Sequence, residues 1–316
     1  MRILRKLFRY LGLNFLGHVS DESEKSEKSI LPPLTYKNDI IKSIHHVDNA
    51  SLETFFATYP PVFILNTGRS GSQFLQNVFQ LSSHCAAYHE AFPNLMYLSN
   101  FAYQNASNHE LLKSIFLSAR LEMMLEACVK QKVFIETNHC LTFYAYQIAD
   151  LMKGAKFVHI TRHPATFVRS GIMKGWHKND TIWEMGRVKL NDAERWEKMS
   201  QIERLSWTWN ATHHFIEDFK KTISVERVLS LKIEDLVKDT DKVNQLLQFT
   251  GGDIVDEATV KKIQSEKVNQ VKKDDDPSNL YKLTQYPHFN EWNDIDKAEL
   301  RTHTLALANS YGYQLS

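Results

Sequence analysis

Hydrophobic residues in this chain gather in short runs, separated by longer stretches in which apolar residues recur at helical spacing. The runs are mostly unbroken rather than alternating with polar residues, which is typical of strands buried on both faces. They lie at residues 62–67, 85–89, 132–137, 156–161 and 227–233. The helical stretches lie at about residues 72–82, 109–130, 142–152, 164–173 and 192–221. This alternation predicts a three-layer α/β/α fold with a central parallel sheet.

The chain before residue 39 has a different pattern. Residues 1–17 place large apolar side chains on one face of a helix and four basic residues, with no acid, on the opposite face. Residues 20–29 contain no apolar side chain, which is typical of a flexible linker. We therefore expect an amphipathic basic helix at residues 1–17, a linker at 18–38 and a single domain over 39–316.

Two interpretations of residues 1–17 remain open. The helix can lie on an anionic membrane surface, or it can pack on the body of the protein. A secretory signal is not expected, because the segment has neither an unbroken apolar core nor a small-residue cleavage site. No run approaches the roughly 18–20 apolar residues of a membrane span. These features favour a cytoplasmic protein, with residues 1–17 as its candidate contact with the inner face of the membrane.

The composition is that of an ordinary globular protein, with 43% hydrophobic and 24% charged residues among 316. The 38 basic and 37 acidic residues leave a net charge of +1, so no overall field favours nucleic acid. The three cysteines show no paired spacing, and the histidines show no metal-ligand spacing. We therefore expect no disulfide framework, no metal site and a reducing compartment.

The first predicted strand runs directly into the sequence TGRSGSQFL, residues 67–75, and then into a helix. Gly68 and Gly71 allow a tight turn in which backbone N–H groups converge, and the helix N-terminus adds a partial positive charge. Arg69 adds a formal positive charge, and the neighbouring serines add hydroxyl donors. The segment therefore predicts an anion-binding loop at the carboxyl end of a buried strand.

This loop is not a Walker A motif. Asn66 stands where that motif has its first glycine, and Ser72 and Gln73 stand where it has lysine followed by serine or threonine. The groups that hold a γ-phosphate and Mg²⁺ are therefore missing. A ligand with a shorter phosphate chain and no required metal fits the loop better.

A second candidate phosphate site follows the fourth predicted strand. Arg162 stands at the end of that strand, Pro164 suits the first turn of a helix, and Ser170 lies two turns into the helix. Arg162 and Ser170 can therefore face one phosphate, with a bidentate charged contact and a hydroxyl. The alternative is that Arg162 pairs with a local carboxylate.

Together the two motifs resemble those of sulfotransferases that use 3′-phosphoadenosine 5′-phosphosulfate, PAPS. The sequence TGRSGSQFL is similar to their 5′-phosphosulfate loop, and RHPATFVRS, residues 162–170, is similar to their 3′-phosphate motif. The resemblance extends to residues 233–236 and to residues 311–313, and it covers about residues 60–316. It is nearest to the prokaryotic and carbohydrate-type members.

The resemblance implies a P-loop nucleotide-binding type of fold and the transfer of a sulfuryl group from PAPS. The acceptor would be a hydroxyl or amine, most naturally on a carbohydrate or glycan, and the product 3′,5′-ADP would form by in-line displacement without a metal. Two rivals remain: a nucleotide-dependent kinase on the related fold, and a non-catalytic nucleotide-binding member. Stronger stabilisation of the protein by 3′,5′-ADP than by Mg-ATP would exclude the kinase. Binding of PAPS without turnover would favour the non-catalytic protein.

The resemblance also assigns roles to single residues. Arg69 would contact the bridging oxygen between phosphate and sulfate, which gains negative charge as the sulfuryl group leaves. Arg162 and Ser170 would hold the 3′-phosphate, and Phe74 would meet the adenine. The full set of donor-binding residues would be Thr67, Gly68, Arg69, Ser70, Gly71, Ser72, Gln73, Phe74, Arg162 and Ser170.

Two residues at strand ends are candidates for the base that takes the acceptor's proton. Glu90 follows the second predicted strand and resembles the glutamate that serves as base in carbohydrate-type members. His139 follows the third predicted strand, where other branches of the family place a catalytic histidine. Glu90 is the favoured candidate, and His139 is the alternative.

Overall fold

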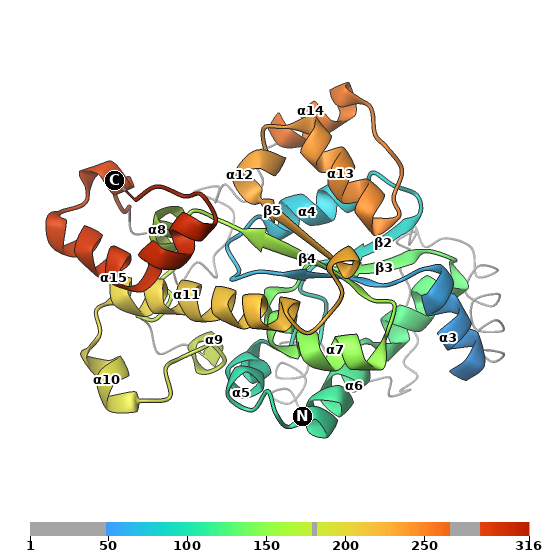
Figure 1. Ribbon diagram of the computed structural model, residues 1–316, viewed down its shortest axis with the longest axis horizontal. Coiled ribbons are helices and arrows are strands. Elements are labelled where there is room, and N and C mark those ends of the chain that lie inside the picture. The colour runs from blue at the N-terminus through green and yellow to red at the C-terminus, as the bar shows by residue number, and fades with distance from the viewer. Residues whose placement is uncertain (1–48, 179–181, 266–284, 316) are drawn as a thin grey trace, which may run out of the picture. The chain divides into compact units, whose positions relative to one another are not determined.

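The computed structural model describes residues 49–178, 182–265 and 285–315, which Figure 1 draws in colour. The predicted helix at residues 1–17, the linker at 18–38 and the start of the predicted domain lie outside these residues. The described chain is built around a five-stranded sheet in the order β2-β3-β1-β4-β5. The strands are β1 (Val62–Leu65), β2 (Cys85–Tyr88), β3 (Val133–Glu136), β4 (Lys156–Thr161) and β5 (Val228–Lys232).

All neighbouring strands of the sheet are parallel, so their carboxyl ends meet at one edge. The register pairs Phe63 of β1 with Glu136 of β3 and Leu65 of β1 with His159 of β4. Each of the five predicted strand runs contains one strand. The predicted three-layer α/β/α fold with a central parallel sheet is therefore confirmed.

Helices cover both faces of the sheet (Figure 1). One face carries α3 (Asn49–Thr58), α5 (Ser99–Gln104), α6 (His109–Val129), α7 (Ala145–Leu151) and α11 (Gln201–Lys220). The other carries α4 (Ser72–Phe79), α12 (Ile233–Leu236), α13 (Thr240–Thr250) and α14 (Glu257–Ser265). Beyond the carboxyl end of β4, α8 (Pro164–Met173) and α15 (Asp294–Ser310) pack on α11. Shorter helices are η1 (Met96–Leu98), η2 (His139–Tyr144), α9 (Ile182–Met185), α10 (Ala193–Lys198), η3 (Val225–Arg227) and η4 (Phe289–Glu291).

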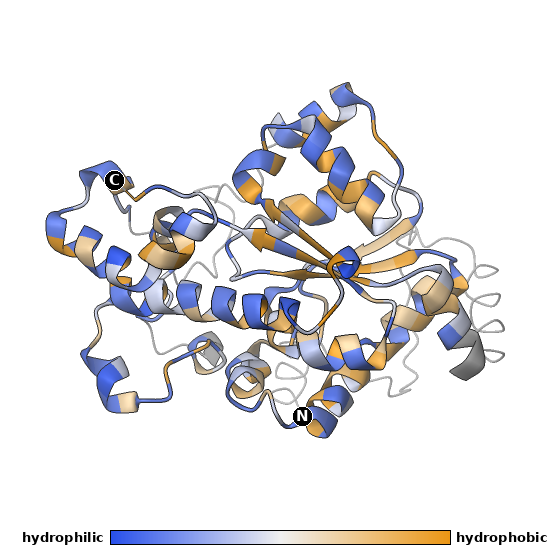
Figure 2. Ribbon diagram, viewed as in Figure 1, coloured by the Kyte–Doolittle hydropathy of each residue, from blue (hydrophilic) through white to orange (hydrophobic). Residues whose placement is uncertain are grey.

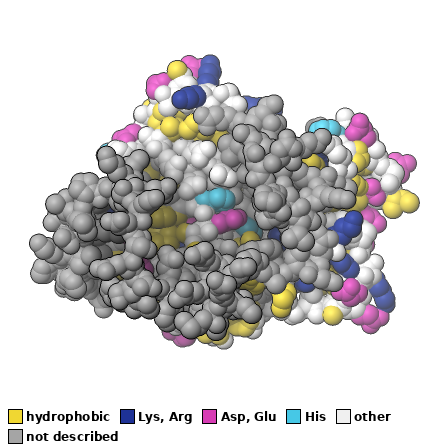
Figure 3. Space-filling model, turned by 180° about the vertical axis from the view of Figure 1, so that it is seen from behind, with side chains coloured by type: hydrophobic (Ala, Val, Ile, Leu, Met, Phe, Trp, Pro, Cys, Tyr) yellow, Lys and Arg dark blue, Asp and Glu magenta, His cyan; other side chains and the backbone are white. Residues whose placement is uncertain are grey.

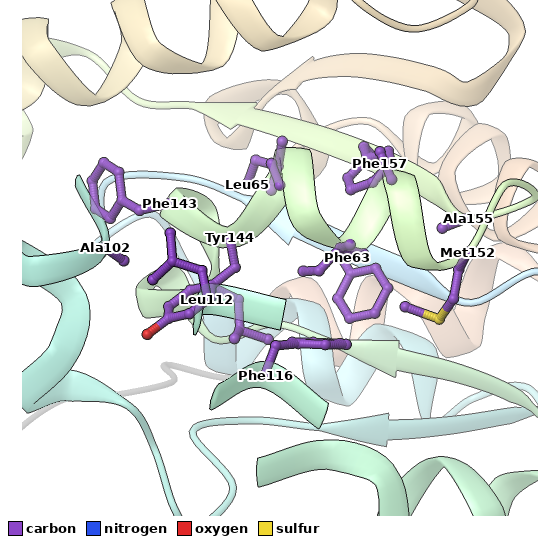
Figure 4. Packing of buried hydrophobic residues seen from close by; sticks show 14 of the residues in the cluster. Phe63, Leu65, Ala102, Leu112, Phe116, Phe143, Tyr144, Met152, Ala155 and Phe157 are labelled. Atoms are coloured by element: carbon purple, nitrogen blue, oxygen red, sulfur yellow. The ribbon is translucent and has the colours of Figure 1, made fainter. Parts of the chain in front are cut away.

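The unbroken apolar runs divide their side chains between two cores, because successive residues of a strand point to opposite faces. Phe63, Phe134 and Phe157 pack with α6 and α7 in the core that Figure 4 shows in part. Val62 and Ile64 pack on the other face with α4 and α13. The strands are accordingly the most continuously hydrophobic part of the fold in Figure 2.

The stretch predicted as one helix over residues 192–221 is two helices, which is the main departure from the predicted elements. The chain breaks after Met199, and Ser200 caps the start of α11. The Ser200 hydroxyl accepts from the Glu203 N–H at 3.1 Å, and the Glu203 carboxylate accepts from the Ser200 N–H at 2.9 Å. This reciprocal capping box favours a helix start inside an otherwise continuous apolar pattern. Among the described helices, none is long and apolar enough to cross a bilayer.

Candidate active site

The carboxyl edge of the sheet brings together the loops that follow β1, β2, β3 and β4. Arg69, Glu90, His139 and Arg162 stand on these four loops, one residue to each. Arg69 contacts the helix after β4, and Glu90 lies beside His139. The candidate residues from distant parts of the sequence therefore meet at the edge where parallel sheets bind their ligands.

The loop after β1 requires its two glycines. Gly68 and Gly71 have φ angles of 74° and 76°, in the left-handed region that side chains disfavour. A Cβ atom on Gly71 would lie 2.5 Å from the Ile233 side chain, and one on Gly68 would lie 2.9 Å from the His139 ring. The glycines thus allow the turn and also let the loop approach His139 closely.

Hydroxyl groups inside this loop hold its own backbone. Thr67 Oγ1 and Ser70 Oγ each donate to the Gly68 carbonyl, at 3.0 and 2.9 Å, and Ser70 is fully buried. The Asn66 side chain accepts from the Gly68 N–H at 2.7 Å. No side chain caps the first amides of α4 after Gly71. The groups that the loop presents to an anion are therefore these amides and Arg69, rather than the Ser70 hydroxyl.

Other residues predicted to bind the donor have different environments. Ser72 and Gln73 open α4 and are part-exposed beside its uncapped amides. Phe74 is buried in the core on the α4 and α13 face, among Val78 and other apolar side chains. Its packing role is evident from the structure, and its contact with adenine stays a prediction.

Hydrogen bonds join the two predicted phosphate loops. Arg69 Nε donates to Ser170 Oγ at 3.0 Å, and Arg162 Nη1 donates to the Arg69 carbonyl. Burial lowers the pKa of both guanidinium groups, while Glu90 opposes this effect at Arg69 and Glu234 opposes it at Arg162. Because arginine stays charged even so, two poorly solvated cations share a small volume, which favours a ligand with several negative charges.

Glu90 and His139 form a charged pair. Glu90 Oε1 lies 3.6 Å from His139 Nδ1. The interaction with His139 lowers the pKa of Glu90 to about 2. Burial by itself lowers the pKa of His139, but the Cys140 sulfur and the Glu90 carboxylate outweigh it and raise that pKa above its usual value. At neutral pH the pair therefore holds its proton on His139.

His139 lines a small cavity of about 30 Å³ that lies next to Gly68. Its other ring nitrogen, Nε2, is 3.7 Å from Cys140 Sγ. Its ring lies nearly parallel to that of Trp176, with centroids 6.2 Å apart. The surface that lines the cavity is mostly apolar, and Met96, Phe143, Trp176 and Val188 contribute to it beside polar residues such as Ser99 and Thr208. Glu90 is not among the lining residues, so His139 stands between the cavity and Glu90.

Arg187 forms part of the wall of this cavity. No motif in the sequence marked it as a site residue. Its guanidinium carbon lies 3.8 Å from the centroid of the Trp176 ring. Arg187 Nε donates to Glu184 at 2.5 Å, which places an opposite charge directly against it. The charge of Arg187 is therefore largely balanced inside the protein, unlike the charges of Arg69 and Arg162.

Strained backbone is concentrated at this site. Arg69, Glu90 and His177 have positive φ angles of 51°, 47° and 59°. Such conformations cost non-glycine residues about 1–3 kcal/mol each and persist where surrounding contacts enforce them. The loops are therefore held in shapes that local preference disfavours.

A buried ion pair holds the segment after Glu90. Arg120 and Glu136 have no exposed surface, and two guanidinium nitrogens donate to the carboxylate at 2.5 and 2.7 Å. A third nitrogen of Arg120 donates to the Pro93 carbonyl at 2.7 Å. Asn138 donates to the Asn94 carbonyl at 2.8 Å. These contacts join the chain after β2 to the end of β3, where His139 begins η2.

Figure 3 views the opposite face from Figure 1, and there histidine and acidic side chains lie close together beside a hydrophobic patch. Across residues 49–178, 182–265 and 285–315, no three histidine, cysteine, aspartate or glutamate side chains are grouped to share a metal ion.

Several solved structures and one family model are similar to this chain. A search of curated proteins found no match. Among solved structures, a sulfotransferase domain from the curacin biosynthetic pathway is 15% identical, with 81% of this chain and 98% of that chain covered and a TM-score of 0.45. A domain from the Synechococcus PCC 7002 olefin synthase is 19% identical, with 81% and 95% covered and a TM-score of 0.42. Mouse sulfotransferase SULT7A1 complexed with PAP is 15% identical, with 84% and 93% covered and a TM-score of 0.43.

A model of the sulfotransferase family matches residues 60–256. The match includes β1 to β5, the glycine loop after β1 and the Arg162 loop after β4. It covers more than half of the chain and confirms the resemblance drawn from those two loops. The chain therefore belongs to the sulfotransferase family.

Proposed function

We propose that this sulfotransferase transfers the sulfuryl group of PAPS to a hydroxyl group in the cavity beside His139 and releases 3′,5′-ADP. PAPS is the donor that the family resemblance implies. The observation that carries the proposal is the direct hydrogen bonding between the Arg69 and Arg162 loops. Two cationic loops in contact suit a nucleotide that carries phosphate groups at both its 5′ and 3′ positions.

In this proposal the amides at the start of α4 bind the 5′-phosphate, and Arg162 and Ser170 bind the 3′-phosphate. Arg69 stands between the two, within hydrogen-bond distance of Ser170. During transfer, a bond forms between the acceptor oxygen and sulfur while the bond from sulfur to the bridging oxygen breaks. Arg69 would stabilise the negative charge that develops on the leaving oxygen.

We assign the general base to His139, with Glu90 holding and orienting its ring. The assignment rests on the placement of His139 between the cavity and Glu90. In its neutral form His139 keeps the Nδ1 proton toward Glu90, which leaves Nε2 to accept the acceptor's proton, in the manner of other histidine–carboxylate pairs. Glu90, the base favoured from the sequence, is the second candidate. Its pKa of about 2 makes it the weaker base.

The acceptor that we propose is a hydroxyl of a carbohydrate. The resemblance to carbohydrate-type members supports this choice. The test is a transfer assay with PAPS labelled in the sulfuryl group, run against polysaccharides, lipid-linked glycans and small alcohols. Label transfer to carbohydrate acceptors alone supports the proposal, whereas transfer only to small alcohols would overturn the carbohydrate assignment.

The donor is tested separately by thermal unfolding with nucleotides. We expect 3′,5′-ADP to raise the melting temperature more than Mg-ATP does, because at equal concentration the ligand that binds more tightly stabilises the protein more. The reverse order would favour the kinase alternative. Binding of PAPS without transfer to any acceptor would favour a non-catalytic nucleotide-binding protein.

We also propose that residues 1–17 bind anionic membrane surfaces reversibly. The apolar face and the four basic residues of that segment support the proposal. Co-sedimentation of the full chain with liposomes should increase with the fraction of anionic lipid and decrease with salt. Equal sedimentation with neutral liposomes would contradict this.

A further inference from the structure

The residues on both sides of Arg162 are held by one hydrogen-bond network. Thr161 Oγ1 lies 3.0 Å from the Tyr313 hydroxyl, and both groups are buried. The His163 N–H donates to Glu234 Oε1 at 2.9 Å. The Tyr313 hydroxyl donates to Glu234 Oε2 at 2.9 Å, which closes the network. The backbone around Arg162 is thus tied to the C-terminal segment and to the start of α12.

The same network occupies both oxygens of Glu234. Glu234 is close enough to Arg162 to be the main charge that raises its pKa against the effect of burial. Even so, no described ion pair joins the two side chains, because the carboxylate is directed at the His163 amide and the Tyr313 hydroxyl. The Arg162 guanidinium therefore keeps donors for a ligand.

Further contacts hold the C-terminal segment against the loop. His163 Nε2 lies 3.0 Å from the Gln314 carbonyl oxygen, and the Lys232 ammonium lies 4.7 Å from the centroid of the Tyr313 ring. Trp209 Nε1 donates to the Arg162 carbonyl at 3.0 Å. Thr161, Arg162 and His163 are therefore each fixed by a partner from another part of the chain.

We propose that Tyr313 and Glu234 are positioning residues that hold Arg162 for the 3′-phosphate of the donor. The proposal rests on the role given above to Arg162. Without the Tyr313 hydroxyl, Glu234 Oε2 loses its partner and can turn to the Arg162 guanidinium, where it competes with the phosphate. Recognition of the 3′-phosphate then depends on two residues that contact no part of the nucleotide.

The test compares Tyr313→Phe with Tyr311→Phe by titration calorimetry of the full chain with 3′,5′-ADP and with 5′-AMP. Tyr311 is a matched control, because its hydroxyl also donates to a carboxylate, that of Glu217 at 2.8 Å, which takes no part in the network of Thr161, His163, Glu234 and Tyr313. We expect Tyr313→Phe to weaken 3′,5′-ADP about three- to tenfold, the usual effect of one lost hydrogen bond. Affinity for 5′-AMP should stay within about twofold, and Tyr311→Phe should leave both affinities unchanged.

Equal weakening of both nucleotides by Tyr313→Phe, or no weakening, would overturn the inference. Failure of the proposed function is visible separately: the wild-type protein would then bind 3′,5′-ADP no better than 5′-AMP. A second pair of variants covers the case in which Tyr313→Phe does not fold. Glu234→Gln keeps groups that can bond to His163 and Tyr313 and should retain the preference for 3′,5′-ADP. Glu234→Ala leaves the His163 amide and the Tyr313 hydroxyl without this acceptor, so it should reduce that preference. The same preference in both variants would also overturn the inference.

Discussion

The proposed nucleotide side and the proposed acceptor side of this site are built in different ways. On the nucleotide side, Arg69 and Arg162 stand in compact loops that begin where a strand ends, and hydrogen bonds to neutral groups hold them. On the acceptor side, Trp176 and Arg187 come from the segment after α8, and Glu184 balances the charge of Arg187. One side thus keeps its positive charge available, while the other presents a mostly apolar wall.

We expect this difference to separate donor binding from the sulfuryl-transfer step. Unbalanced cations favour a multiply charged donor and stabilise a leaving group that gains charge. The apolar lining favours an acceptor with an apolar face beside its reacting hydroxyl. His139 and Glu90 lie at the boundary, beside Gly68 of the donor loop and beside the cavity. Substitutions on the two sides should therefore change different measured constants.

The largest effect is expected at this boundary. His139→Ala removes the proposed base and should lower the turnover number by about 10²-fold or more. Affinity for 3′,5′-ADP should stay within about twofold, because no donor phosphate is assigned to His139. Transfer assays and titration calorimetry of the same preparation measure both. Near-normal turnover would show that His139 is not the base.

A substitution on the nucleotide side should instead weaken binding of 3′,5′-ADP. Arg162→Ala removes a charge-assisted contact worth about 1.5–3 kcal/mol, so 3′,5′-ADP should bind about ten- to a hundredfold more weakly. Binding of 5′-AMP, which lacks the 3′-phosphate, should hardly change. If calorimetry shows that both nucleotides weaken equally, Arg162 does not recognise the 3′-phosphate and the two-loop donor site is wrong.

The pH dependence of turnover distinguishes the two candidate bases. His139 must lose its proton before it can accept one, so turnover should rise with pH as His139 deprotonates. Glu90 raises the pKa of His139, so Glu90→Gln should move this rise to lower pH, by about one pH unit or more. A loss of about 10²-fold at every pH, with no shift, would instead make Glu90 the base.

The smallest effect is expected on the acceptor side. Trp176→Leu removes the aromatic wall that packs between His139 and Arg187 and should raise the KM for the acceptor about three- to tenfold. The KM for PAPS should change less, because Trp176 packs beside Gly68 but donates no described hydrogen bond to either predicted phosphate loop. Initial rates at varied concentrations of each substrate give both constants. A larger change in the KM for PAPS would show that the two sides are not separate.

The nucleotide side could be predicted because its signals are local. Gly68, Gly71 and Arg69 follow an unbroken apolar run, and such a run predicts a buried strand whatever packs on it. A glycine turn between a strand and a helix then orients backbone amides without help from distant residues. The same reasoning placed Arg162, Glu90 and His139 at strand ends, and therefore at one edge of a parallel sheet.

Tertiary contacts decided how the side chains are arranged at the carboxyl edge of the sheet. The packing of Phe74 in the core depends on neighbours that a local pattern does not identify. The Ser70 hydroxyl and the break after Met199 depend instead on contacts within three residues, which the apolar pattern alone did not reveal. Arg187 and Glu184 are only three residues apart, but the place of Arg187 in the cavity wall depends on its packing against Trp176.

The sequence by itself thus determined the five strands, most of the helices between them, the placement of the loops after β1 and β4, and the family. Only the tertiary structure decided which charges stay unbalanced, which side chain faces the cavity, and how Tyr313 and Glu234 hold the chain around Arg162. The physical reason is the range of the interactions. Backbone preferences and apolar periodicity act over a few residues, whereas hydrogen-bond and ion-pair partners are chosen by the packing of segments that can be far apart in the chain.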